Sequence, residues 1–101
     1  MAALSLQHST ATGNAQNGVF VDDDSTGNFV VDLGGGALDG TGGNRIFGNT
    51  GNDLRVDLDG GELSAENNWW GDPSGLDPAN VQLDSGSTVD ASPALTSDPN
   101  L

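Results

Sequence analysis

The chain has 101 residues, and fifteen acidic residues against two arginines give it a formal net charge of −13. Nucleic acid and anionic membrane surfaces repel such a chain, so both are excluded as partners. Cysteine is absent, which excludes disulfides, and no apolar run reaches membrane-spanning length. The N-terminal segment MAALSLQHS lacks the basic region and the long apolar core of a signal peptide.

Short apolar clusters, separated by glycine and asparagine, follow one another along the chain. They alternate apolar with polar residues and are rich in valine, leucine and phenylalanine, which predicts short β-strands. None carries the apolar stripe of a helix. In chain order the clusters are LSL (4–6), GVFV (18–21), FVVDL (29–33), GAL (36–38), RIF (45–47), LRVDL (54–58), GELSA (61–65), NWW (68–70), VQL (81–83), TVDA (88–91) and PAL (93–95).

A regular repeat orders these clusters. VDLGGG begins at Val31, VDLDGG at Val56 and VQLDSG at Val81, so the motif recurs every 25 residues. A repeat of about 25 residues with three short strands predicts a β-solenoid, in which stacked coils bury a continuous core that one coil cannot bury alone. We expect a single domain over residues 1–101 with about four coils, at residues 4–28, 29–53, 54–78 and 79–96, and a tail at 97–101.

The repeat also predicts which side chains stack. Val31, Val56 and Val81 should form one inward-facing column with successive Cα atoms about 4.8 Å apart, the spacing of neighbouring strands. The segments NRIFGN (44–49) and NNWWGD (67–72) align at an interval slightly shorter than the repeat, which places Trp69 over Ile46 and Trp70 over Phe47.

Asparagine recurs at the turns before two of these clusters, as Asn44 and as the pair Asn67 and Asn68. Asparagine tolerates left-handed turns, and stacked asparagines can form a ladder of side-chain hydrogen bonds. We expect that structural role for all three.

The pattern NRIFGNTGNDLRVDL…ENNWWGDPSG, with the closing STVDASPAL, resembles the C-terminal coils of right-handed parallel β-helix repeat proteins, the pectate-lyase-like superfamily. The resemblance covers roughly residues 4–96. It implies an all-β, right-handed parallel β-helix with three short strands in each coil. It also implies a secreted or cell-surface protein, although the members range from polysaccharide-processing enzymes to adhesins and tailspikes, so the fold alone does not give the activity.

Two groups of residues are candidate calcium ligands, because hard cations prefer several oxygen ligands. The first is the run Asp22, Asp23 and Asp24, for which a solvated turn is the alternative. The second is Asn52 and Asp53, because GNTGNDLRV (48–56) nearly fits the nonapeptide of calcium-binding β-rolls. The segment that follows, DLDGGELSA, breaks that pattern, so we expect no cofactor, with calcium as the open alternative.

An enzyme is not expected. Pectate-lyase-like chemistry would require a basic residue beside a carboxylate cluster, and Arg45 and Arg55 are the only candidates. Their separation along the chain should place them on different sides of a coil, and both are more simply ion-pair partners of nearby aspartates.

The sequence therefore predicts a structural or interaction module that contacts polysaccharide. The alternatives are a remnant of a polysaccharide lyase or hydrolase, a calcium-binding β-roll and a self-assembling solenoid. We also expect self-association through the N-terminal end, where Leu4 and Leu6 would face an open core. Pro93 and Pro99 should discourage strand addition at the other end.

Overall fold

The chain is all-β in the computed structural model, which describes residues 2–22, 29–36, 39–58 and 61–99. Within these residues the only helical segment is the short 3₁₀ helix η1 (Pro78–Asn80). The strands are β1 (Ala2–Ser5), β2 (Thr10–Thr12), β3 (Val19–Asp22), β4 (Phe29–Asp32), β5 (Arg45–Phe47), β6 (Leu54–Asp57), β7 (Glu62–Ser64), β8 (Val81–Asp84) and β9 (Thr88–Asp90).

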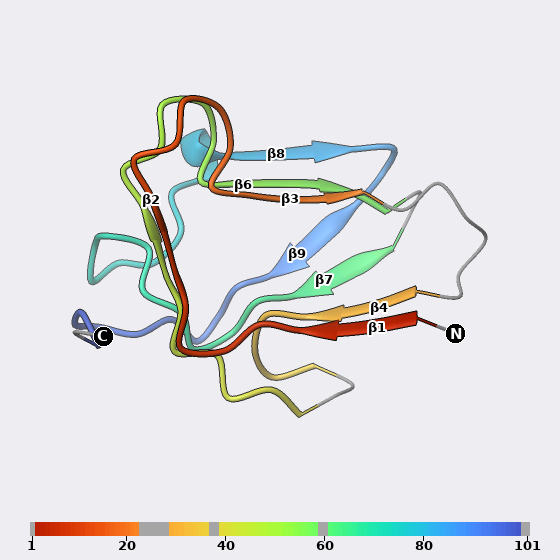
Figure 1. Ribbon diagram of the computed structural model, residues 1–101, viewed down its shortest axis with the longest axis horizontal. Helices are drawn as coiled ribbons and strands as arrows, with labels where there is room; N and C mark the ends of the chain where they lie inside the picture. The colour runs from red at the N-terminus through yellow and green to blue at the C-terminus, as the bar shows by residue number, and fades with distance from the viewer. Residues whose placement is uncertain (1, 23–28, 37–38, 59–60, 100–101) are drawn as a thin grey trace.

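Every strand pairing among the described residues is parallel, in three open sheets. The four-stranded sheet has the order β1-β4-β7-β9, the two-stranded sheet is β2-β5, and the three-stranded sheet has the order β3-β6-β8. The chain runs through the three sheets in this order from β1 to β3, which we call its first pass, and again from β4 to β6, its second pass. On the third pass an isolated bridge from Trp69 to Arg45 takes the place of a strand in the two-stranded sheet. Figure 1 looks along the stack and shows the passes lying over one another.

The predicted register of the repeat is wrong. Val31 lies in β4 and pairs with Leu4, whereas Val56 lies in β6, in another sheet, and pairs with Val21 and Leu83. The true interval between paired strands is longer than the predicted one, and it differs from one pair of strands to the next, even within one sheet. Strands in different sheets bury one face in the same way, so the apolar pattern VDL recurs in both sheets. The first step of the repeat therefore joins β4 to β6, which are not paired, and the second joins β6 to β8, which are paired with Val81 beside Leu54 and not beside Val56.

The predicted alignment of the tryptophans is also wrong, by one residue. Arg45 lies beside Trp69, and therefore Ile46 lies beside Trp70. This register sends Trp70 into the core, where 5% of its surface is exposed, and leaves Trp69 half-buried on the outside. Of the other predicted clusters, GAL includes residues 37 and 38, which lie outside the described residues, and PAL (93–95) forms no strand.

The core lies between the three sheets. Leu54 and Val56 of β6 point inward and are fully buried, while Arg55 and Asp57 alternate with them on the outer face. The same alternation carries through the neighbouring strands in register, so the inner columns are aliphatic. The buried apolar residues are Val21, Leu33, Ile46, Leu54, Val56, Leu63, Ala65 and Trp70.

An asparagine ladder lies beside this core and confirms the role predicted for Asn44 and Asn68. Both side chains are fully buried, and Asn44 Nδ2 donates to Asn68 Oδ1 at 2.9 Å. Asn68 Nδ2 donates to the carbonyls of Leu33 and Ala65, both at 2.9 Å. Asn67 instead takes the left-handed conformation, with φ of 62°. The ladder joins three passes of the chain, because Asn44 also accepts from the amide of Ser9.

The loop between β4 and β5 is organised by a buried carboxylate. Asp32 is fully buried and accepts hydrogen bonds from the amides of Gly34, Gly36 and Gly40 at 2.7, 3.1 and 2.9 Å. Gly34 has φ of 145°, and a Cβ there would collide with the carbonyl of Glu66, so only glycine fits. The loop adds residues to the second pass without disturbing the stacked strands.

Candidate functional site

The structure separates the roles of the two residues proposed for a calcium-binding turn. Asn52 and Asp53 lie between β5 and β6, and Asn52 Nδ2 donates to Gln82 Oε1 at 3.3 Å. Asp53 is 4% exposed, and its Oδ1 accepts from the amide and the Nδ2 of Asn49 at 3.2 and 3.0 Å. Asp53 therefore holds its own turn together through Asn49.

The other calcium proposal lies only partly within the described residues. Asp22 ends β3 and is exposed, whereas Asp23 and Asp24 lie outside the described residues. The pairing aligns Asp22 with Asp57 of β6 and with Asp84 of β8, so three aspartates form one column on the outer face of the three-stranded sheet. We call these three residues the aspartate column. Sequence reasoning missed it, because it depends on the true register. Among the described residues no group of three or more His, Cys, Asp or Glu side chains is arranged to hold a metal ion.

Both arginines are engaged in ion pairs. Arg55 Nε donates to Asp84 Oδ2 at 2.8 Å, and its guanidinium lies 4.5 Å from the centre of the Phe20 ring. This hydrogen bond lowers the pKa of Asp84 below its ordinary value. Arg45 forms a two-point pair with Asp98, at 2.7 and 2.9 Å, which raises the pKa of the guanidinium further. The two arginines lie in different sheets, as the sequence predicted.

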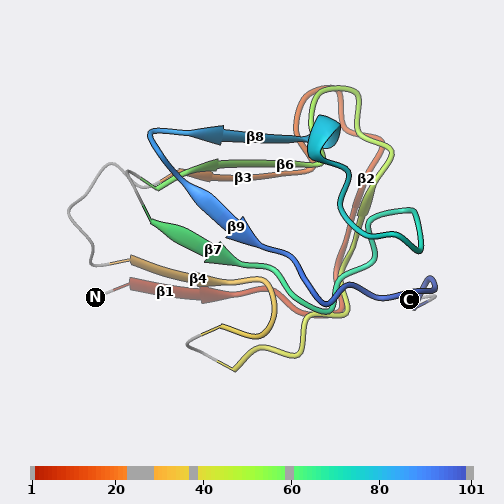
Figure 2. The ribbon, with the colours of Figure 1, turned by 180° about the vertical axis from the view of Figure 1, so that it is seen from behind.

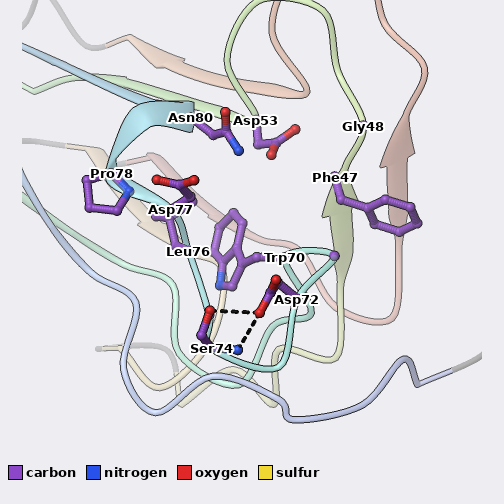
Figure 3. Close-up of a pocket in the computed structure, with 12 residues that line it drawn as sticks. Phe47, Gly48, Asp53, Trp70, Asp72, Ser74, Leu76, Asp77, Pro78 and Asn80 are labelled. Carbon is purple, nitrogen blue, oxygen red and sulfur yellow. Dashed lines mark hydrogen bonds between the residues drawn. The ribbon is translucent and has the colours of Figure 1, made fainter.

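A pocket of about 470 Å³ opens beside Trp70. Its lining comes from the end of β5, the turn before β6, and the segment from Trp70 to Asn80. Figure 3 shows the indole of Trp70 in the middle of the pocket, with Asp53 and Asn80 on one side and Asp72 and Ser74 on the other. The ring of Phe47 points away from these side chains. Sequence reasoning singled out the two tryptophans but did not find the pocket.

Turn chemistry fixes two of the pocket's carboxylates. Asp72 Oδ1 accepts from the amide of Ser74 at 2.8 Å and from its hydroxyl at 2.7 Å. These hydrogen bonds lower the pKa of Asp72. Asp77 caps η1, because its side chain accepts from the amide of Ala79 at 2.9 Å. In each case only Oδ1 takes part, so within the described residues the second carboxylate oxygen remains available as an acceptor.

Trp70 supplies a donor with no acceptor. Its Nε1 is buried and makes no hydrogen bond within the described chain. A buried N–H group without a partner costs about 1–3 kcal/mol. In Figure 3 the nitrogen-bearing edge of the indole is turned toward Ser74. Because the nitrogen atom itself is buried, it adds no accessible donor to the pocket.

The pocket is negatively charged. Asp53, Asp72 and Asp77 line it, and its described lining contains no arginine or histidine. Leu76, Pro78 and the Trp70 ring give it apolar surface between the carboxylates. Its volume falls within the range of small-molecule sites, about 300–1,000 Å³.

Comparisons with protein family models, with curated proteins and with solved structures find no match to this chain. Among the described residues, no helix has the length and apolar character needed to cross a bilayer.

Proposed function

We propose that the chain is a structural and interaction module, a short right-handed parallel β-helix that acts outside the cell or on its surface. The path of the chain supports this fold, because successive passes enter the three sheets in one order and the described pairings are parallel. The asparagine ladder and the aliphatic inner columns supply the stacking that such repeats need.

The module contacts saccharide through the pocket beside Trp70. The observation that carries this proposal is the lining itself, in which apolar surface alternates with carboxylate oxygens. A hydroxyl group donates a hydrogen bond, so sugar hydroxyls suit the free carboxylate oxygens of Asp72 and Asp77. A pyranose ring adds an apolar face that packs against Leu76 and Pro78.

The charge of the pocket selects an uncharged sugar. Three carboxylates without a cation in the described lining repel uronates, whose own carboxylates would need an arginine or a lysine nearby. Arg45 and Arg55 are not in the lining and are held by Asp98 and Asp84. These features favour a binding module over a lyase that acts on an acidic polysaccharide.

The proposal is tested by tryptophan fluorescence in a Trp69→Phe background, where Trp70 is the only tryptophan. Two probes differ only at C6: trigalacturonate, and the same trisaccharide after its carboxyl groups have been reduced to hydroxymethyl groups. We expect the neutral form to shift the Trp70 emission with saturation. At low salt the acidic form should bind at least about tenfold more weakly, a difference of about 1.4 kcal/mol.

Asp72→Asn and Asp77→Asn are the matched variants, because asparagine keeps the turn and cap hydrogen bonds and removes only the charge. Each variant should weaken binding of the neutral sugar, since hydrogen bonds to charged acceptors are the stronger ones. Each should also reduce the difference in affinity between the neutral sugar and the uronate, because one repelling carboxylate is removed. Glu62→Gln, on β7 and outside the pocket, is the control and should change neither. The absence of any saturable shift, or equal binding of both probes, would refute the saccharide proposal.

A further inference from the structure

The first pass of the chain forms an exposed edge on all three sheets. β1, β2 and β3 are each the terminal strand of their sheet, so one side of each has no strand partner within the described chain. Unpaired strand edges recruit other strands unless charge, proline or a covering segment prevents it. We call β1, β2 and β3 together the first-pass edge, and it faces the viewer in Figure 1.

An apolar cavity opens at this edge. Its volume is about 160 Å³, and it lies between the four-stranded and three-stranded sheets, lined mainly by aliphatic side chains of β1, β3 and β4. Leu4 is 53% exposed, whereas Leu63, which points the same way two strands further into the sheet, is fully buried. The difference arises because Leu4 has no further strand beside it in the described chain. Asp22 is the only charged residue in the described lining.

The opposite edge has a different shape. β8 and β9 are separated only by residues 85–87, whereas β3 ends at Asp22 and β4 begins at Phe29. Figures 1 and 2 show the result: β9 turns inward toward β8, while β1 and β3 stay far apart. The tail also covers part of this edge, because the carbonyl of Pro93 accepts from Asn67 and the amide of Leu95 donates to Asn68. A narrow, partly covered edge does not fit a wide, open one.

The wide edge is complementary to itself. β1 and β3 have four residues each, and Figure 1 shows that they run in opposite directions. Both strands contribute side chains to the lining of the cavity. A half-turn about a line that runs between the two strands and parallel to them places β1 of one copy onto β3 of another. The two strands are then antiparallel. The same rotation brings β3 onto β1, so both ladders form together, as symmetric interfaces require.

We propose that the first-pass edge binds a second copy of this chain around this two-fold axis, with β1 of each copy paired antiparallel to β3 of the other. The two cavities then face each other and the exposed Leu4 side chains become buried. The edge itself is nearly uncharged, so the repulsion between two chains of net charge −13 acts at longer range and is screened by salt. Association should therefore strengthen with salt and stop at two copies.

Sedimentation at low and high salt tests the surface. We expect the native chain to dimerise at high salt and Leu4→Lys to remain monomeric. Leu83→Lys is the matched control, because Leu83 is an inward-facing leucine left 44% exposed at the opposite edge, in β8. It should dimerise like the native chain. A native chain that stays monomeric at high salt and high concentration would refute the proposal, and so would loss of association in Leu83→Lys alone.

Cross-linking tests the pairing, since the chain has no cysteine of its own. Ser5 and Phe20 both lie on the outer faces of the edge strands, and the proposed pairing brings each near the other across the interface. We expect a mixture of Ser5→Cys and Phe20→Cys chains to form a disulfide-linked pair, and neither variant alone to do so. Linkage of Ser5→Cys chains to one another would mean β1–β1 pairing and would overturn the arrangement. This inference is independent of the saccharide pocket, which lies at another corner and is read out by Trp70.

Discussion

At the scale of single residues, the buried asparagines are the side chains on which the stability of the fold depends most. Asn44 makes hydrogen bonds to all three passes, through Ser9, Leu33 and Asn68 among others. Each of these groups is polar and lies at the corner of the core. Removing one member of such a network leaves the others buried without partners, which costs more than the lost bond alone.

We therefore expect Asn44→Ala to destabilise the fold by about 2–4 kcal/mol, a large share of the roughly 5–15 kcal/mol typical of a domain. Urea unfolding followed by tryptophan emission measures this. Asn14→Ala is the control, because Asn14 is exposed and its Nδ2 donates to Asn49 Oδ1 at 2.8 Å. Asn14→Ala should lower the free energy of unfolding by well under half as much as Asn44→Ala does. Equal decreases would contradict a special role for the buried ladder.

Glu66 gives the fold a pH dependence. Its hydrogen bond with Asp90 is the main cause that raises its pKa above the ordinary 4.5, and repulsion from Asp90, Asp32 and Glu62 adds to the shift. A carboxyl whose pKa is raised on folding contributes stability while it is protonated, and that stability is lost as the pH rises through the raised pKa.

We expect Glu66→Gln to raise the unfolding temperature at neutral pH, because glutamine keeps a donor for Asp90 without the charge. The gain should shrink as the pH falls and vanish below the ordinary pKa of glutamate, where folded and unfolded chains are both protonated. Thermal unfolding of both proteins across this pH range measures it. Glu62→Gln, which removes an equal charge from a minor contributor, should give a smaller gain. A gain that does not depend on pH would refute this explanation.

At the scale of secondary-structure elements, the aspartate column places three like charges on neighbouring strands. Directly paired residues in adjacent strands interact, and like charges in such pairs are destabilising by a few tenths of a kcal/mol up to about 1 kcal/mol. Arg55 compensates the charge of Asp84 through their ion pair. Asp57, in the middle, has a carboxylate on each side.

Asp57→Asn should stabilise the fold by about 0.5 kcal/mol at low salt, and the gain should disappear near 1 M salt, where the screening length is about 3 Å. Denaturant unfolding at the two salt concentrations measures it. Asp77→Asn is the control, since asparagine keeps its helix cap and Asp77 lies outside the strands.

Calcium provides a further arm of the same experiment. We expect calcium to raise the unfolding midpoint of the native chain no more than magnesium or sodium at matched ionic strength, as general screening does. A large calcium-specific shift would show that a bound ion stabilises the folded state and would support the calcium alternative.

The strands could be predicted from the sequence, because the alternation of apolar and polar residues within one cluster is enough to indicate a strand. The clusters at residues 18–21, 29–33, 54–58 and 81–83 all became strands. The strand Thr10–Thr12 was missed, because TAT contains no large apolar side chain. The aspartate column, the strand pairing and the pocket could not be predicted, since all of them depend on which strands lie side by side.

At the scale of the whole molecule, the register of the paired strands could not be predicted from the sequence, for a physical reason. Every strand presents one apolar face to the same core, so sequence similarity does not distinguish a neighbour in the same sheet from a strand in another. The passes also differ in length, because the loop held by Asp32 enlarges only the second one. The asparagine ladder was the exception, because Asn44 and Asn68 occupy the same corner on consecutive passes.

The parallel pairing of the strands has a kinetic consequence. The described sheets contain no hairpin, and each strand pairs with one a full pass away, as Ala2 does with Phe29 and Val19 with Leu54. No described strand can therefore find its partner through a tight turn, and each first contact must close a long loop before any apolar burial compensates for the entropy lost. We therefore expect such a chain to fold on the slow side of small domains, in milliseconds to seconds, with a nucleus that contains two consecutive passes.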